Sequence, residues 1–231
     1  MRTLIVPDVH ERVWQLKALE DPISKADRVV MLGDFYDTFV KPGANVEAMC
    51  GFVRQALTNP KFTVLLGNHD CHYYFDNHAF KCSGYRPSTG AIVRTLLQDK
   101  EIERSRLWTK VGPYTVSHAG FHPLTQDFLK EGQDKLIGIA MKEDFHPVFA
   151  AGYGRGGSAP LGGPTWLDFH TEFEHVDGMP QIVGHSVGKE VRVQTAKDGA
   201  KDFCLDTSGK HYAWVDEESG EVWIETTKSE P

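Results

Sequence analysis

The chain has 231 residues, of which 40% are hydrophobic and 25% charged, and its formal net charge is −7. This length is enough for a substantial core, and both fractions are ordinary for a globular protein. The net negative charge argues against a large basic surface, so non-specific nucleic-acid binding is not expected. No linker, repeat or low-complexity tract interrupts the chain, so we expect one domain over residues 1–231.

The N-terminal third alternates short apolar runs with amphipathic segments. Apolar runs at residues 3–6, 28–32 and 62–66 predict three buried strands. Apolar residues at three- and four-residue spacing predict helices around 13–19 and 46–57. This alternation indicates β-α-β crossovers and parallel strands.

The rest of the chain changes from helices to strands. Helices are predicted around 92–97 and 136–141, with a strand at 114–117 between them. The glycine-rich segment 152–164 carries one charge, Arg155, and predicts a loop. Later apolar runs predict successive strands at 181–183, 191–195, 203–205, 211–215 and 221–225.

The N-terminal apolar run is too short for a signal-peptide core, and no run approaches membrane-spanning length. The four cysteines form no C-x-x-C pair, so we expect free thiols in a reducing cytosol; a disulfide or a zinc-thiolate site is the alternative. The prediction is a cytoplasmic protein with no membrane partner, and the oligomeric state stays open.

Potential metal ligands directly follow five of the predicted strands. They are Asp8, His10, Asp34, Asn68, His118 and His185. The carboxyl ends of strands in an open α/β sheet meet at one crevice, so these side chains are expected to converge. Carboxylate, amide and imidazole ligands suit divalent Mn, Fe or Zn, and the lack of a thiolate cluster disfavours a structural zinc site.

These residues lie in short motifs with a recognisable order. The motifs are Asp8-Val9-His10, Gly33-Asp34-Phe35-Tyr36-Asp37, Gly67-Asn68-His69-Asp70, His118-Ala119-Gly120, Gly184-His185-Ser186 and Cys204-Leu205-Asp206-Thr207. The set resembles the calcineurin-like metallophosphoesterases, and in particular the phosphoprotein phosphatase branch, which includes bacterial and phage phosphatases and diadenosine tetraphosphatases. The resemblance implies an α/β fold of two packed, mainly mixed β-sheets flanked by helices, with the metal site at the C-terminal ends of strands.

The resemblance also implies a role for each motif residue. Asp8, His10 and Asp34 would bind a first divalent ion, and Asp34 would bridge to a second ion completed by Asn68, His118 and His185. Manganese is the expected metal, with iron or zinc as alternatives. A hydroxide shared by the two ions would attack phosphorus, and His69, oriented by Asp37, would protonate the leaving group.

Three positions depart from the family pattern. Glu11 stands where glycine is usual, and its side chain is expected to face solvent or Arg12, with a role near the metals as the alternative. Thr38 replaces an arginine that grips the substrate phosphate; Arg155 is a candidate replacement, with Asn68 as a further phosphate contact, and a solvated Arg155 is the alternative. Val187 replaces a second histidine of many phosphodiesterases, which favours the phosphatase branch.

Several polar residues near these motifs have a simpler expected role. His72, Tyr73 and Tyr74 are expected to pack, with base stacking as the alternative, and His122 is expected to be structural. Glu172, Glu174 and His175 are interpreted as solvated.

The leading functional hypothesis is hydrolysis of phosphomonoesters, either on a phosphoprotein or on a small metabolite. One alternative is cleavage of a nucleoside polyphosphate such as diadenosine tetraphosphate. A second is a metal-binding scaffold without activity, but a scaffold has no need of the proton donor His69 and its partner Asp37.

Overall fold

The computed structural model describes residues 1–38, 40 and 42–228, so the end of the predicted 1–231 domain lies outside the described residues. The first of its two sheets has the strand order β10-β9-β1-β2-β3. Its strands are β1 (Arg2–Val6), β2 (Arg28–Met31), β3 (Phe62–Val64), β9 (His211–Asp216) and β10 (Val222–Thr226). β1, β2 and β3 are parallel, and β9 runs antiparallel to both β1 and β10.

The second sheet has the order β4-β5-β6-β8-β7. Its strands are β4 (Trp108–Val111), β5 (Tyr114–Ser117), β6 (Gln181–Val183), β7 (Arg192–Thr195) and β8 (Lys201–Cys204). The three central strands are parallel, and the edge strands β4 and β7 are antiparallel to their neighbours. Both sheets are therefore mixed and flanked by helices, which confirms the predicted fold class.

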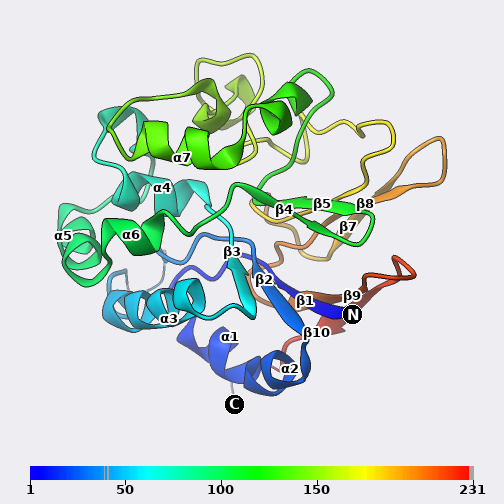
Figure 1. Ribbon diagram of the computed structural model, residues 1–231, viewed down its shortest axis with the longest axis horizontal. Coiled ribbons are helices and arrows are strands. Elements are labelled where there is room, and N and C mark those ends of the chain that lie inside the picture. The colour runs from blue at the N-terminus through cyan, green and yellow to red at the C-terminus, as the bar shows by residue number, and fades with distance from the viewer. Residues whose placement is uncertain (39, 41, 229–231) are drawn as a thin grey trace.

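The helices lie mainly on the outer side of the first sheet and beyond its β3 edge, as Figure 1 shows. They are α1 (Val13–Ala18), α2 (Glu20–Lys25), α3 (Val46–Thr58), α4 (Asn68–Tyr74), α5 (Pro87–Leu96), α6 (Asp99–Ile102) and α7 (Gln133–Ala140). Four short 3₁₀ segments, η1 (His78–Phe80), η2 (Gln126–Lys130), η3 (Pro147–Phe149) and η4 (Tyr153–Arg155), complete the helical elements. No helix of the described residues has both the length and the apolar character needed to cross a bilayer.

The apolar β1 strand explains how the layers hold together. Successive side chains of a strand point to opposite faces. Leu4 and Val6 accordingly join the core beneath the helices, whereas Ile5 joins the core between the two sheets with residues such as Val116 and Ile182. Burial on both faces is why this strand reads as a continuous apolar run.

Sequence and structure agree on most elements and differ in three regions. The predicted helix at 13–19 corresponds to α1, whereas the short helices α2, α4 and α6 and the antiparallel strand β4 were not predicted. β4 is exposed at one position and only partly buried at two, so its sequence lacks an apolar run. All four cysteines are free, as expected.

Candidate metal centre

Three ligand groups meet after β1 and β2. Ligand atoms of Asp8, His10 and Asp34 lie within 4.8 Å of one another. The His10 Nδ1 atom is 2.9 Å from the carbonyl of Tyr36, which fixes the ring proton on Nδ1. The Nε2 atom of His10 is then free to act as a ligand and lies 3.6 Å from Asp34 Oδ2.

A second group forms on the other side of Asp34. Ligand atoms of Asp34, His118 and His185 also lie within 4.8 Å of one another. His118 directs Nδ1 to the carbonyl of Leu32 at 2.8 Å, so its Nε2 carries a lone pair. That lone pair faces Asp34 Oδ2 at 3.4 Å and Asn68 Oδ1 at 3.1 Å. Since all three atoms are acceptors, a cation among them fits this arrangement better than a hydrogen bond.

The charges in this pocket also fit cation binding. Burial raises the pKa of Asp8, with Asp206 nearby adding to the effect, and burial raises the pKa of Asp34 well above its usual value. Burial lowers the pKa of His10 to about 4 and that of His185 well below its usual value. The imidazoles are therefore neutral, as metal ligands must be, and divalent cations would compensate the buried carboxylates.

The loops after the strands adopt unusual backbone conformations to bring these groups together. His10, Asp34 and His185 have φ angles of 44°, 51° and 62°. Non-glycine residues in this region are strained by about 1–3 kcal/mol each and cluster at functional sites. Gly33 and Gly67 have no side chains where their two backbones touch, and a Cβ on either would overlap the other loop.

A histidine and an aspartate lie beside the two ligand groups. His69 Nδ1 is 2.9 Å from Asp37 Oδ2, and the His69 backbone N–H donates to Asp34 Oδ1 at 2.9 Å. Burial lowers the pKa of His69, but the charges of Asp34 and Asp37 outweigh it and the net pKa is raised. The pKa of Asp37 is about 2, because hydrogen bonds from His69, His72 and Tyr73 outweigh its burial.

Arg155 is anchored next to the ligand His185. Its Nε lies 2.6 Å from Asp168 Oδ2, and a terminal nitrogen donates to Ser186 Oγ at 2.8 Å. The Arg155 side chain is therefore partly buried and paired with Asp168 rather than fully solvated. The loop is held by Glu172, whose buried carboxylate accepts hydrogen bonds from three backbone N–H groups. The donors are those of Gly154, Gly162 and Asp168, each at 3.1 Å.

Two expectations about acidic side chains are thus corrected. Glu172 is buried and not solvated, since it organises the loop that carries Arg155. Glu11 is also buried and does not face solvent. Its carboxylate accepts hydrogen bonds from the backbone N–H groups of Thr38, Gly43 and Asn45, at 3.1–3.4 Å, and so secures the loop after Asp37.

The expectations for the other polar and aromatic residues near the motifs agree with the structure, except that for His175. His72, Tyr73 and Tyr74 are buried, which confirms packing. His122 accepts the backbone N–H of Leu124 at 3.0 Å, a structural role, and Glu174 has a side chain that is 70% exposed. The remaining residue of the set interpreted as solvated, His175, is instead mostly buried and lies 2.7 Å from Asp202.

Sequence reasoning missed Asp70 and Arg86. Asp70 accepts hydrogen bonds from the backbone N–H groups of Asp34, Phe35 and Gly67 at 2.7–3.0 Å, and so ties the second and third motifs together. Its place in the Gly-Asn-His-Asp motif was the available signal. Arg86 NH1 lies 3.8 Å from Asp37, and nothing local in the sequence marks that contact.

Comparisons with known proteins agree with this geometry. The family model described as calcineurin-like phosphoesterase matches residues 1–189. A cold-active protein-tyrosine phosphatase from a psychrophilic Shewanella species is similar in structure, with a TM-score of 0.63 and 14% identity over 98% of this chain and 80% of that chain. The structure of a proposed diadenosine tetraphosphatase gives a TM-score of 0.55 and 15% identity over 99% of this chain and 95% of that one. No curated protein sequence matches the chain.

Fold and ligand groups together define a metal-binding phosphoester hydrolase. The chain belongs to the calcineurin-like phosphoesterase family, whose model covers residues 1–189, and it is a phosphoric ester hydrolase. The structural neighbours, at 14–15% identity, support the fold alone.

Proposed function

We propose that this protein hydrolyses phosphomonoesters with two divalent cations, most suitably Mn²⁺, held by the six strand-end residues and with His69 as general acid. The supporting observation is the position of the Asp34 carboxylate. Its Oδ2 atom lies 3.6 Å from His10 Nε2 on one side and 3.4 Å from His118 Nε2 on the other, so one carboxylate belongs to both ligand groups. When bound, a cation pair lowers the pKa of bound water and neutralises phosphoryl charge.

The side chains around the ligands would protonate the leaving group and contact the phosphate. Asp37 orients the His69 ring by accepting from Nδ1, and the charges of Asp34 and Asp37 raise the pKa of that ring and favour its charged form, in which Nε2–H donates to the departing ester oxygen. Arg155, fixed by Asp168 and Ser186 beside His185, supplies a positive charge to the phosphoryl oxygens in place of the family arginine at Thr38. Asn68 would supply a further contact to the phosphate.

One observation favours the second candidate, hydrolysis of a nucleoside polyphosphate. The ring of Trp166 packs edge-on against the ligand His185, with ring centroids 5.7 Å apart, and Tyr153 on the same loop is 66% exposed. Exposed aromatic faces beside a phosphate site can stack on a base. The Asp37–His69 pair serves this reaction as well, because a leaving phosphate oxygen also needs neutralisation.

A substrate panel with a metal assay tests both candidates. Purified protein loaded with Mn²⁺ is given p-nitrophenyl phosphate, bis-p-nitrophenyl phosphate, a phosphopeptide and diadenosine tetraphosphate. The proposal predicts about two metal ions per chain and the highest kcat/KM on the monoesters. Preference for diadenosine tetraphosphate would replace it with the second candidate, and no turnover in the metal-loaded protein would refute both.

A further inference from the structure

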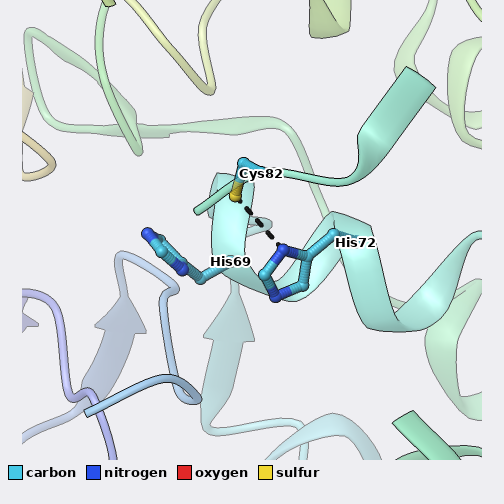
Figure 2. Close-up of side chains that lie close together, drawn as sticks. All are labelled: His69, His72 and Cys82. Carbon is cyan, nitrogen blue, oxygen red and sulfur yellow. Dashed lines mark hydrogen bonds between the residues drawn. The ribbon is translucent and has the colours of Figure 1, made fainter. Parts of the chain in front are cut away.

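A third group of metal-ligating side chains lies beside the paired-ligand centre. One ligand atom each of His69, His72 and Cys82 lies within 4.8 Å of the others. Figure 2 shows the two histidines on α4, with the Cys82 sulfur reaching between them from the segment that follows η1. Residues three apart on a helix share a face, so the spacing of His69 and His72 places both rings under Cys82.

The protons of this cluster are arranged for metal binding. His72 Nε2 is 2.6 Å from Asp37 Oδ2, and this close approach to a carboxylate favours the ring proton on Nε2, although the contact lacks the geometry of a hydrogen bond. The lone pair of His72 Nδ1 then faces the Cys82 sulfur at 3.1 Å. A carboxylate behind a ligating histidine is the usual support of a zinc site.

The spacing suits a tetrahedral ion. Zinc–sulfur and zinc–nitrogen bonds of about 2.3 and 2.0 Å place the two ligand atoms about 3.5 Å apart, and so only a small widening of the Cys82–His72 contact is required. Cys82 is half-buried and the His69 side chain is 12% exposed, so an ion can enter from solvent. A thiolate with two imidazoles selects Zn²⁺ or Cd²⁺ over Mn²⁺.

We infer that His69, His72 and Cys82 bind one soft divalent cation, Zn²⁺ or Cd²⁺, and that this ion inhibits hydrolysis. Binding releases the Cys82 thiol proton and one proton of the charged His69 ring to solvent, and forms sulfur–metal and nitrogen–metal bonds. A metal on either nitrogen of His69 takes the place of a proton or breaks the contact with Asp37. The inhibitory half rests on the proposed role of His69 as proton donor; the binding half does not.

Cadmium reports on the site without any use of activity. Mn²⁺-loaded protein is titrated with Cd²⁺, and the ultraviolet thiolate-to-cadmium charge-transfer band is recorded for the wild type, Cys82→Ser and Cys50→Ser. Cys50 is buried and contacts Tyr36, away from the cluster, so Cys50→Ser is the matched control. The band should appear in the wild type and the control and be lost in Cys82→Ser. Its absence from the wild type, or its persistence in Cys82→Ser, would overturn the site.

Zinc inhibition of p-nitrophenyl phosphate hydrolysis tests whether an ion bound at this site inhibits the enzyme. Loss of even an outer-shell partner typically weakens metal binding 10–100-fold, so Cys82→Ser should require more than about 100-fold more Zn²⁺ for the same inhibition. Equal inhibition of both proteins would place zinc in the paired-ligand centre and refute the inhibitory role. A cadmium band in a protein without hydrolase activity would support the site while refuting the proposed function.

Discussion

Asp37 contacts several charged and polar side chains beside the candidate metal centre. It contacts His69, His72 and the Tyr73 hydroxyl at 2.5–2.9 Å, and Arg86 approaches to 3.8 Å. With a pKa of about 2 it stays charged at any working pH. An anion behind His69 orients that ring and raises its pKa, which favours the charged form that a general acid needs.

Replacing His69 by Gln should therefore lower kcat by roughly 10²–10⁴-fold, the usual contribution of a positioned general acid. Bound Mn²⁺ should not change, because His69 is not among the six proposed ligands of the paired-ligand centre. Steady-state kinetics and metal analysis of the same sample check this. His78→Gln, at an exposed histidine, is the control and should be neutral. Metal loss in step with the activity would make His69 a ligand instead.

Arg155→Met should lower kcat/KM by about 10–100-fold, since a hydrogen bond to a charged group contributes about 1.5–3 kcal/mol. Arg104→Met, at an exposed arginine, is the control. Unchanged kinetics in Arg155→Met would rule out a phosphate contact.

The Arg155→Met substitution should also change the pKa of Asp168. Partial burial raises the pKa of Asp168. The charge of Arg155 and hydrogen bonds from His170 and Thr171 lower this pKa by more than burial raises it, so the net pKa is depressed. Asp168 thus contributes stability above about pH 4, its unfolded pKa, that is lost as pH falls through the folded pKa. Arg155→Met should raise this pKa, as carboxyl NMR titration would show. An unchanged titration would mean that the ion pair is absent in solution.

At the scale of elements, two buried glutamates hold loops around the candidate centre by accepting hydrogen bonds from backbone N–H groups. Glu11 secures the loop after Asp37, and Glu172 secures the glycine-rich loop with η4 and Arg155. Each carboxylate accepts three backbone N–H groups that the loop cannot satisfy by itself. Rigid loops keep charged side chains at a fixed distance from substrate.

Glu172→Gln should destabilise the protein by about 1–3 kcal/mol, because a buried amide cannot accept from all three N–H groups and brings donors of its own. Urea unfolding measures this change. Glu174→Gln is the matched control two residues away, and its exposed position predicts a change within about 0.5 kcal/mol. Equal effects at both positions would mean that Glu172 does not hold the loop.

At the scale of the whole molecule, both sheets contribute to one centre. Asp8, Asp34 and Asn68 follow strands of the first sheet, whereas His118 and His185 follow β5 and β6 of the second. Bound cations would therefore join the two halves of the sandwich. Ligand binding to the folded state alone adds about 2.7 kcal/mol at 100-fold excess over Kd.

Chelation of the metals should lower Tm, and the difference in Tm between loaded and chelated protein should narrow as the pH falls. The pKa values of Asp8 and Asp34 are raised in the metal-free fold, so this fold is stabilised by protonation and loses that stability as pH rises through them. Scanning calorimetry at several pH values measures both curves. A chelated protein that melts at the same temperature as the loaded one would contradict cation binding here.

The sequence alone determined most of the strand-and-helix order, because apolar runs mark strands, and it placed six potential ligands at strand ends that meet at a common edge. The two-sheet fold class followed from the resemblance of the motifs to a known family. Only the tertiary structure decided which polar residues are buried. The burial of Glu11 and Glu172 and the pairing of Cys82 with His72 could not be predicted from the sequence. Their partners lie on loops or turns whose approach depends on how the layers pack, and a local pattern carries no record of such contacts.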